Sequence, residues 1–243
     1  MIPRDDEDGA VRPDRLERIE DRLERIEDRI EHGLEMIKPK LRGWLHAGTF
    51  PLAVLLGAIL VILAPDQRTR VSTAIFAVTA SVLFGVSALY HRGRWSPRTR
   101  GVLQRLDHAN IFLIIAGTYT PFSVLLLPSG PARTLLWIVW SGALLGVAFR
   151  VLWVGAPRWL YVPVYIALGW VAVVYLPQFW RAGAGVFTLV LIGGALYTIG
   201  AVVYGLRRPD PSPRWFGFHE VFHAFTVLAF LTHYTGVSLA VHA

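Results

Sequence analysis

Histidines and carboxylates near the ends of apolar segments are the residues of this chain that could do chemistry. Residues 219–223 read His-Glu-Val-Phe-His at the start of the last apolar segment. His219 and His223 are four apart, so a helix would present both imidazoles on one face, one turn apart. That spacing suits two nitrogen ligands of a tetrahedral zinc ion, with Zn–N distances of about 2.0–2.1 Å. The pentapeptide therefore predicts part of a metal site.

Two other segments carry side chains of the same kind. Ser87 and His91 are also four apart, so a hydroxyl and an imidazole would share one helical face. Asp107 opens the next apolar segment and is one of only four acidic residues after residue 42. His91 and a water would complete an open site of the catalytic type, and Asp107 would hold that water or orient an imidazole. Without a metal, each histidine would instead bond a carbonyl group or a lipid headgroup at the membrane interface.

The pentapeptide also matches the His-Glu-x-x-His motif of zinc peptidases, in which the glutamate is the general base. Glu220 would lie about 100° around the helix from His219. We therefore expect the carboxylate to point elsewhere, toward an arginine such as Arg214. An intramembrane peptidase is a minor alternative.

The remaining histidines are expected to stand apart from this site. His233 is ten residues beyond His223, about 15 Å along a helix axis, so a packing or hydrogen-bonding role is expected. His46 and His242 fall near the ends of apolar segments and are expected to be solvated, as is His32.

Composition places the chain in a membrane class. It has 243 residues, of which 54% are hydrophobic, and nine tryptophans, which is too apolar for a soluble domain. The absence of cysteine excludes disulfides and thiolate metal sites. Residues 1–42 hold ten basic and thirteen acidic side chains, whereas residues 43–243 hold fourteen arginines and four acids. This basic balance indicates membrane orientation and contact with anionic lipid headgroups rather than binding of nucleic acid.

Seven apolar segments are long enough to cross a hydrocarbon core of about 30 Å, which needs about 20 residues. The sequence therefore predicts an all-α membrane protein built as a seven-transmembrane helix bundle. The first segment is short and the fifth contains Pro163. The predicted spans are 48–64, 71–91, 107–127, 134–154, 158–177, 186–206 and 218–240.

The distribution of positive charge predicts the orientation of this bundle. Thirteen lysines and arginines lie on the side of the N-terminus, and four arginines lie on the opposite side. Because cytoplasmic loops carry the excess of positive charge, we expect a multi-pass protein of the plasma or inner membrane with its N-terminus in the cytoplasm. Ser87, His91, Asp107, His219 and His223 then all fall at the cytoplasmic end.

A charged heptad repeat occupies the segment before the first span, residues 1–42. Residues 15–21 and 22–28 are identical, and their leucines and isoleucines recur at coiled-coil positions flanked by charges. This pattern predicts either a homo-oligomer formed through residues 15–37 or a solvated amphipathic helix along the membrane. No catalytic role is expected for it.

Three motifs in order resemble those of the bacterial hemolysin III proteins, which belong with the progestin and adipoQ (adiponectin) receptors and more distantly resemble alkaline ceramidases. They are Ser-Ala-Leu-Tyr-His at 87–91, the Asp-His-Ala-Asn segment at 107–122 and His-Glu-Val-Phe-His-Ala-Phe at 219–225. The resemblance covers roughly residues 42–240. It implies a seven-helix domain over residues 43–243, zinc held by His91, His219 and His223, and Asp107 and Ser87 beside the water that the zinc activates.

The site that the resemblance implies suits zinc-dependent hydrolysis of a lipid amide or ester, with a membrane lipid or fatty acid as the bound partner. Asp107 would take the proton of the water, and Ser87 would stand beside it as the second catalytic group. Two alternatives stay open: a regulator of membrane lipids that has no turnover, and the cytolytic role carried by the family name. Seven helices with short loops give little reason to expect an aqueous channel, so we rank the lytic role last.

Overall fold

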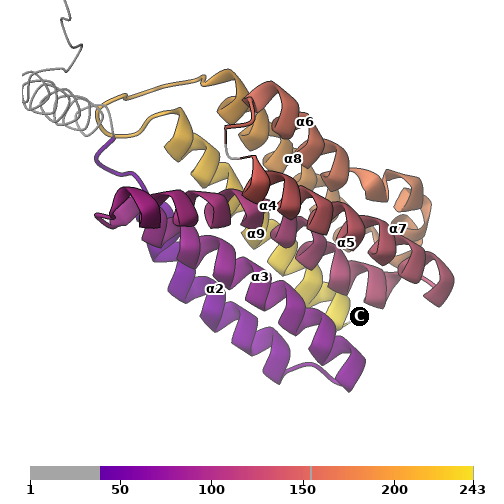
Figure 1. The fold of residues 1–243 in the computed structure, drawn as a ribbon. Helices are drawn as coiled ribbons and strands as arrows, with labels where there is room; N and C mark the ends of the chain where they lie inside the picture. The colour runs from indigo at the N-terminus through magenta and orange to yellow at the C-terminus, as the bar shows by residue number, and fades with distance from the viewer. Residues whose placement is uncertain (1–38, 154, 243) are drawn as a thin grey trace, which may run out of the picture. The chain divides into compact units, whose positions relative to one another are not determined.

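A computed structural model describes residues 39–153 and 155–242, although not the side chain of residue 182, and Lys40–Ala243 forms one compact unit. The predicted heptad helix at 15–37 lies outside the described residues. Within them the regular structure is helical, and seven helices are long and apolar enough to cross a membrane. The prediction of an all-α, seven-span protein is confirmed (Figure 1).

The first four spans are continuous helices joined by short turns. They are α2 (Trp44–Ile62), α3 (Gln67–Arg92), α4 (Pro97–Leu126) and α5 (Ser129–Leu152). The predicted spans begin later than these helices, by ten residues in α4, because hydropathy does not register the polar first turns. The cap signals are nevertheless in the sequence. Ser96 accepts a hydrogen bond from the Thr99 amide with Pro97 at the first helical position, and Asp66 accepts one from the Thr69 amide. This last bond lowers the pKa of the Asp66 carboxyl group.

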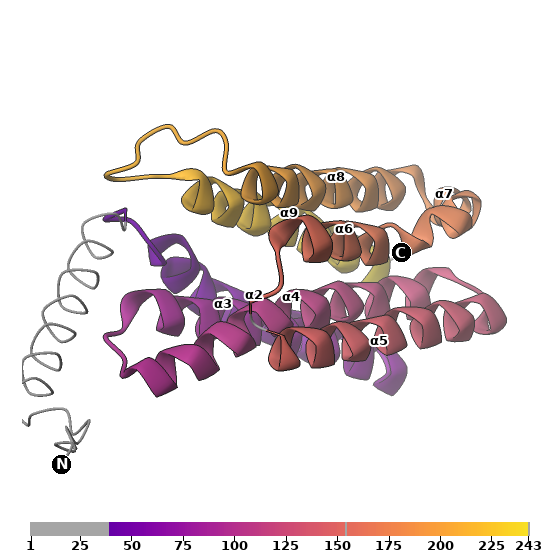
Figure 2. The ribbon, with the colours of Figure 1, turned by 45° about the horizontal axis from the view of Figure 1, so that its top comes forward.

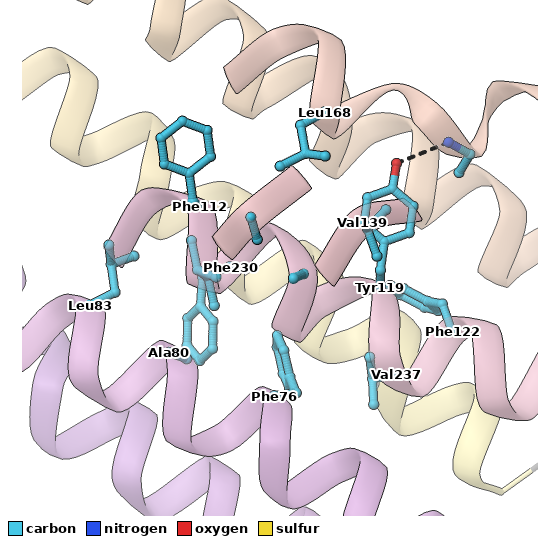
Figure 3. Close-up of a cluster of buried hydrophobic side chains, with 14 of the residues drawn as sticks. Phe76, Ala80, Leu83, Phe112, Tyr119, Phe122, Val139, Leu168, Phe230 and Val237 are labelled. Carbon is cyan, nitrogen blue, oxygen red and sulfur yellow. Dashed lines mark hydrogen bonds between the residues drawn. The ribbon is translucent and has the colours of Figure 1, made fainter. Parts of the chain in front are cut away.

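The fifth span, Arg158–Arg181, is interrupted. It consists of α6 (Arg158–Gly169), a 3₁₀ turn η1 (Val171–Tyr175) and α7 (Leu176–Ala182). Backbone groups freed inside a membrane need new partners, and Tyr119 of α4 supplies them. Its hydroxyl donates to the Gly169 carbonyl at 2.6 Å, and it accepts a hydrogen bond from the Ala172 amide at 3.0 Å, which Figure 3 marks with a dashed line. Pro163 lies inside α6, before the break.

The last two spans, α8 (Ala184–Leu206) and α9 (Phe218–Val241), lie side by side (Figure 2). Consecutive helices α2 to α5 also pack on one another, and α9 contacts α2, α3 and α4, which closes the bundle. In α4, 67% of the most apolar window is buried, against 22–44% in the other spans, so α4 lies at the centre.

Aromatic side chains from α3, α4 and α9 fill the middle of the bundle (Figure 3). Phe76, Phe84, Phe112 and Phe230 are at most 2% exposed. Elsewhere small residues let helices approach closely: an added Cβ on Gly57 of α2 would lie 2.6 Å from the Ala77 Cβ of α3. Large apolar side chains on the outer faces, such as Trp137 and Leu145, are more than two-thirds exposed. Such faces are stable against lipid rather than water.

Candidate metal centre

Three histidines from two helices meet at one end of the bundle. His91 lies in the last turn of α3, and His219 and His223 lie in the first two turns of α9. One ligand nitrogen from each lies within 4.8 Å of the other two, and the Nε2 atoms of His91 and His219 are 3.2 Å apart. Tetrahedral zinc with Zn–N of about 2.0–2.1 Å separates its nitrogens by roughly 3.3–3.4 Å. The spacing of the imidazoles is therefore close to that of a zinc site.

The chemistry of these side chains also fits a metal ion that prefers nitrogen. His91 and His223 are 7% and 2% exposed, and Nδ1 of His223 is buried with no hydrogen-bond partner among the described residues. A buried polar atom without a partner is costly unless something else binds in its neighbourhood. Imidazole nitrogens suit zinc well, and the chain has no cysteine to compete for it.

Asp107 and Ser87, the two other predicted site residues, lie beside the three histidines. The Asp107 Oδ2 atom is 3.7 Å from the His91 Nε2 atom, and its side chain is 12% exposed. Ser87, one turn before His91 on α3, is 1% exposed and interacts with the Asp107 carboxyl group. Its hydroxyl oxygen makes no hydrogen bond of normal geometry with a described residue, so it remains able to bind a water or a ligand.

Glu220 turns away from the three histidines. Its carboxylate pairs with Arg42, just before α2, and its Oε2 accepts a hydrogen bond from the Gly217 amide at 2.8 Å. The expectation that Glu220 would find an arginine holds, but Arg214 was the wrong partner: the Arg214 carbonyl instead accepts from the Lys40 amide. Glu220 thus caps α9 and ties its first turn to the segment that precedes α2.

His46 was expected to be solvated, and this expectation is wrong. Its side chain is 2% exposed and its ring stacks on that of His223, with centroids 3.7 Å apart and planes 10° apart. The error came from starting the first span at residue 48, whereas α2 begins at Trp44. Gly43, with φ of 78°, could have signalled this start: an added Cβ there would lie 2.7 Å from the Cβ of His91.

An apolar cavity runs through the bundle from these groups. Ser87, Asp107, His219 and His223 line one part of it, and His233 lines another, about 15 Å away along α9. His233 stands apart from the three histidines, as expected, and its Nε2 lies 3.3 Å from the Val190 carbonyl oxygen. The cavity walls between the three histidines and His233 are mostly aliphatic and aromatic. They include Leu83, Ile111, Ile115, Phe122, Val162, Ile166, Trp170 and Phe222.

Comparison with known proteins identifies the family of this chain. Residues 34–234 match the family described as Haemolysin-III related. The chain belongs to this family. It is 35% identical to a Hemolysin-3 homolog of Bacillus subtilis over 159 residues, which are 65% of this chain and 71% of the relative. It is 31% identical to Hemolysin-3 of Bacillus cereus over 174 residues, 70% of this chain and 76% of the relative.

A shorter match reaches the adiponectin receptor-like proteins. The ADIPOR-like receptor IZH2 of Saccharomyces cerevisiae is 43% identical over 53 residues, 20% of this chain and 17% of that receptor. The resemblance inferred from the three motifs is therefore confirmed, both for the hemolysin III family and for its place in the wider receptor-like superfamily. This haemolysin-III related protein is a multi-pass membrane protein.

Proposed function

We propose that this haemolysin-III related protein is a zinc-dependent hydrolase of lipid amides or esters in the cell membrane. One observation carries the proposal: three histidines with metal-ligand spacing and a carboxylate lie where an apolar cavity begins. An acyl chain fits the cavity walls, and its polar linkage would then lie beside the histidines and Asp107. Such a pocket, largely apolar with a few convergent polar groups, is typical of a binding site.

His91, His219 and His223 would hold the zinc. When bound, the metal supplies Lewis-acid chemistry, polarising a carbonyl group and lowering the pKa of water toward about 7. Asp107 accepts the proton from the attacking water and returns it to the leaving amine or alcohol. Ser87, whose hydroxyl has no hydrogen-bond partner among the described residues, binds the attacking water beside Asp107, and the aliphatic walls keep bulk water from the reacting linkage.

The charge distribution supports an orientation with the N-terminus in the cytoplasm and the metal centre near the cytoplasmic face. Thirteen of the seventeen basic residues from Lys38 onward lie on the side of the N-terminus. Since the chain has no cysteine, a single introduced cysteine can report the sidedness of each loop. Ser129→Cys should react with an impermeant thiol reagent in whole cells and Ser96→Cys should not. The opposite pattern would reverse the orientation.

The local match to a protein named as a receptor favours a second candidate, a non-enzymatic regulator that binds a lipid in the same cavity. Two other relatives carry the name Hemolysin-3 or Hemolysin-3 homolog, which suggests lysis. However, cavity walls made mainly of aliphatic and aromatic side chains suit a lipid chain better than the passage of ions. We therefore rank lysis below the other two.

Metal analysis and lipid hydrolysis together test the proposal. The purified protein should hold about one equivalent of zinc. His219→Ala should lower the zinc content below about a third of an equivalent. His242→Ala, a control at the exposed end of α9, should leave the zinc content unchanged. Asp107→Asn should keep the zinc and lower hydrolysis of a panel of lipid amides and esters by about 10²–10⁴-fold. Zinc at wild-type content with no hydrolysis of any lipid would support the regulator, and absence of zinc would refute both the site and the hydrolase.

A further inference from the structure

Two buried or half-buried arginines near the metal centre have no acidic partner among the described residues. After residue 42 the chain has four carboxylates, and each is engaged elsewhere. Asp66 caps α3, Asp107 lies beside His91, Asp210 accepts from the Phe218 amide at 2.8 Å, and Glu220 pairs with Arg42. Arg150, at the end of α5, and Arg158, at the start of α6, are left without a counter-charge in the part of the chain that the structure describes.

Arg150 is the more buried of the two. Its side chain is 2% exposed, its Nη1 reaches only the Trp153 carbonyl at 3.4 Å, and its Nε has no hydrogen-bond partner among the described groups. The guanidinium carbon lies 4.4 Å from the centre of the Tyr161 ring. An aromatic face attracts a cation, but it satisfies none of the N–H donors in the guanidinium plane.

Arg158 approaches the same place from α6. Its guanidinium carbon lies 4.7 Å from the centre of the Tyr204 ring, and its Nη1 is buried with no partner in the described structure. The Tyr161 hydroxyl donates to the Tyr204 hydroxyl at 3.3 Å, so the two tyrosines form a pair with an arginine against each ring. Two positive charges with unused donors thus converge on one pair of phenols.

This arginine–tyrosine cluster, made of Arg150, Arg158, Tyr161 and Tyr204, adjoins the metal end of the cavity. Tyr204 lines the cavity, and its ring lies 5.6 Å from that of His219. His108, another cavity residue, lies 6.4 Å from the Tyr161 ring and within electrostatic range of both guanidinium groups. The two arginines do not line the cavity themselves, but Tyr204, which does, lies against Arg158, so the polar end of a ligand in the cavity would meet the edge of this cluster.

We propose that Arg150 and Arg158 bind a phosphate-type anionic headgroup of a lipid whose chain occupies the cavity. This assignment rests on the proposed function, because it names the class of lipid that the same cavity would hold. Guanidinium groups present planar forks of N–H donors that match the oxygens of a phosphate. Burying a guanidinium without an anion is unfavourable, and an anionic headgroup supplies the missing charge.

Binding measured apart from hydrolysis tests this proposal. Purified protein of measured zinc content is titrated with phosphatidic acid and with phosphatidylcholine of the same acyl chains, in detergent, by native mass spectrometry. The wild type should bind phosphatidic acid at least about tenfold more tightly than phosphatidylcholine, because hydrogen bonds from charged donors to the exposed phosphate add that much affinity. Arg158→Gln should remove most of this preference at unchanged zinc content. Arg98→Gln, an exposed arginine in the first turn of α4, should keep it within about twofold.

The outcomes separate the two proposals. Equal affinity for the two lipids, or equal losses in Arg158→Gln and Arg98→Gln, would overturn the headgroup site whether or not the protein hydrolyses lipids. Retained preference in a protein with no lipid hydrolysis would uphold the site and refute only the enzyme. Arg150→Lys keeps the charge but loses the planar fork, so it should weaken phosphatidic acid binding as well. If inorganic phosphate binds as tightly as phosphatidic acid, the lipid assignment is wrong and the arginines serve a free anion.

Discussion

The ion pair between Glu220 and Arg42 gives the sharpest prediction, because it separates the two interpretations of the His-Glu-x-x-His motif. The carboxylate is 1% exposed and the arginine side chain 19% exposed. Removing one partner of a buried pair costs about 3–5 kcal/mol, and the partial exposure of Arg42 places Glu220→Gln near the lower end, at about 3 kcal/mol. The glutamine can still accept the bond from the Gly217 amide. Glu220→Ala loses that cap as well, for about 1 kcal/mol more.

For a chain of this size, each kcal/mol lost lowers the apparent melting temperature by about 2–4 °C, so Glu220→Gln should lower it by about 6–12 °C. Zinc affinity should fall by about 10–100-fold, as when a group that orients metal ligands is removed, because Glu220 fixes the turn that carries His219. Thermal melts in detergent and competition with a zinc chelator measure the two effects. Asp210→Asn is the control: it changes the same charge near α9, but at an exposed site.

The result that refutes this reasoning is specific. A Glu220→Gln protein with the melting temperature and zinc affinity of the wild type, but with no hydrolytic activity, would show that the glutamate acts as a general base. The peptidase interpretation would then displace the one in which Glu220 is structural.

Two further predictions follow from the contacts around the metal centre and from the heptad repeat. His46→Ala removes the ring stacked on His223 and should weaken zinc binding, whereas His46→Phe keeps a flat ring there and should retain most of the zinc affinity. Equal losses of affinity in the two variants would mean that a nitrogen of His46 matters rather than its stacking. Deleting residues 1–37 spares the backbone bonds from Lys40 and Leu41 to the loop before α9, so the bundle should stay folded while the mass in detergent falls to that of a monomer. An unchanged mass would exclude a homo-oligomer formed through residues 15–37.

The fold could be predicted from the sequence where a single local property decides it. Seven apolar runs gave the seven spans, since length and hydropathy suffice to identify a membrane helix. The start of α4 at Pro97 was missed because its first turns are polar, although Ser96 and Pro97 carry the cap signal. The break after Gly169 was not predicted either, because it depends on the hydroxyl of Tyr119, a residue of another helix.

The candidate site was predictable only as far as spacing along a helix could carry it. His219 and His223 share a face by their spacing alone, the topology added His91 and Asp107 at the same end of the bundle, and the family motifs pointed to the same residues. The stacking of His46 on His223 and the pairing of Glu220 with Arg42 join residues more than 170 positions apart. No local pattern encodes such contacts. Composition nevertheless contained a usable signal for the arginine–tyrosine cluster, since fourteen arginines share four acids after residue 42.

The separation of the proposed metal ligands along the chain has a consequence for biogenesis. His91 and His219 are 128 residues apart, and α9 is the last of the described helices to leave the ribosome. At about 5–20 residues per second, roughly 6–26 s pass between the synthesis of the first histidine and that of the second. Throughout this interval the nascent chain carries only one of the three histidines proposed to hold zinc. If these histidines hold zinc as proposed, the metal would load only after the start of α9 has been synthesised, so bound zinc would mark a chain that has reached its seventh span.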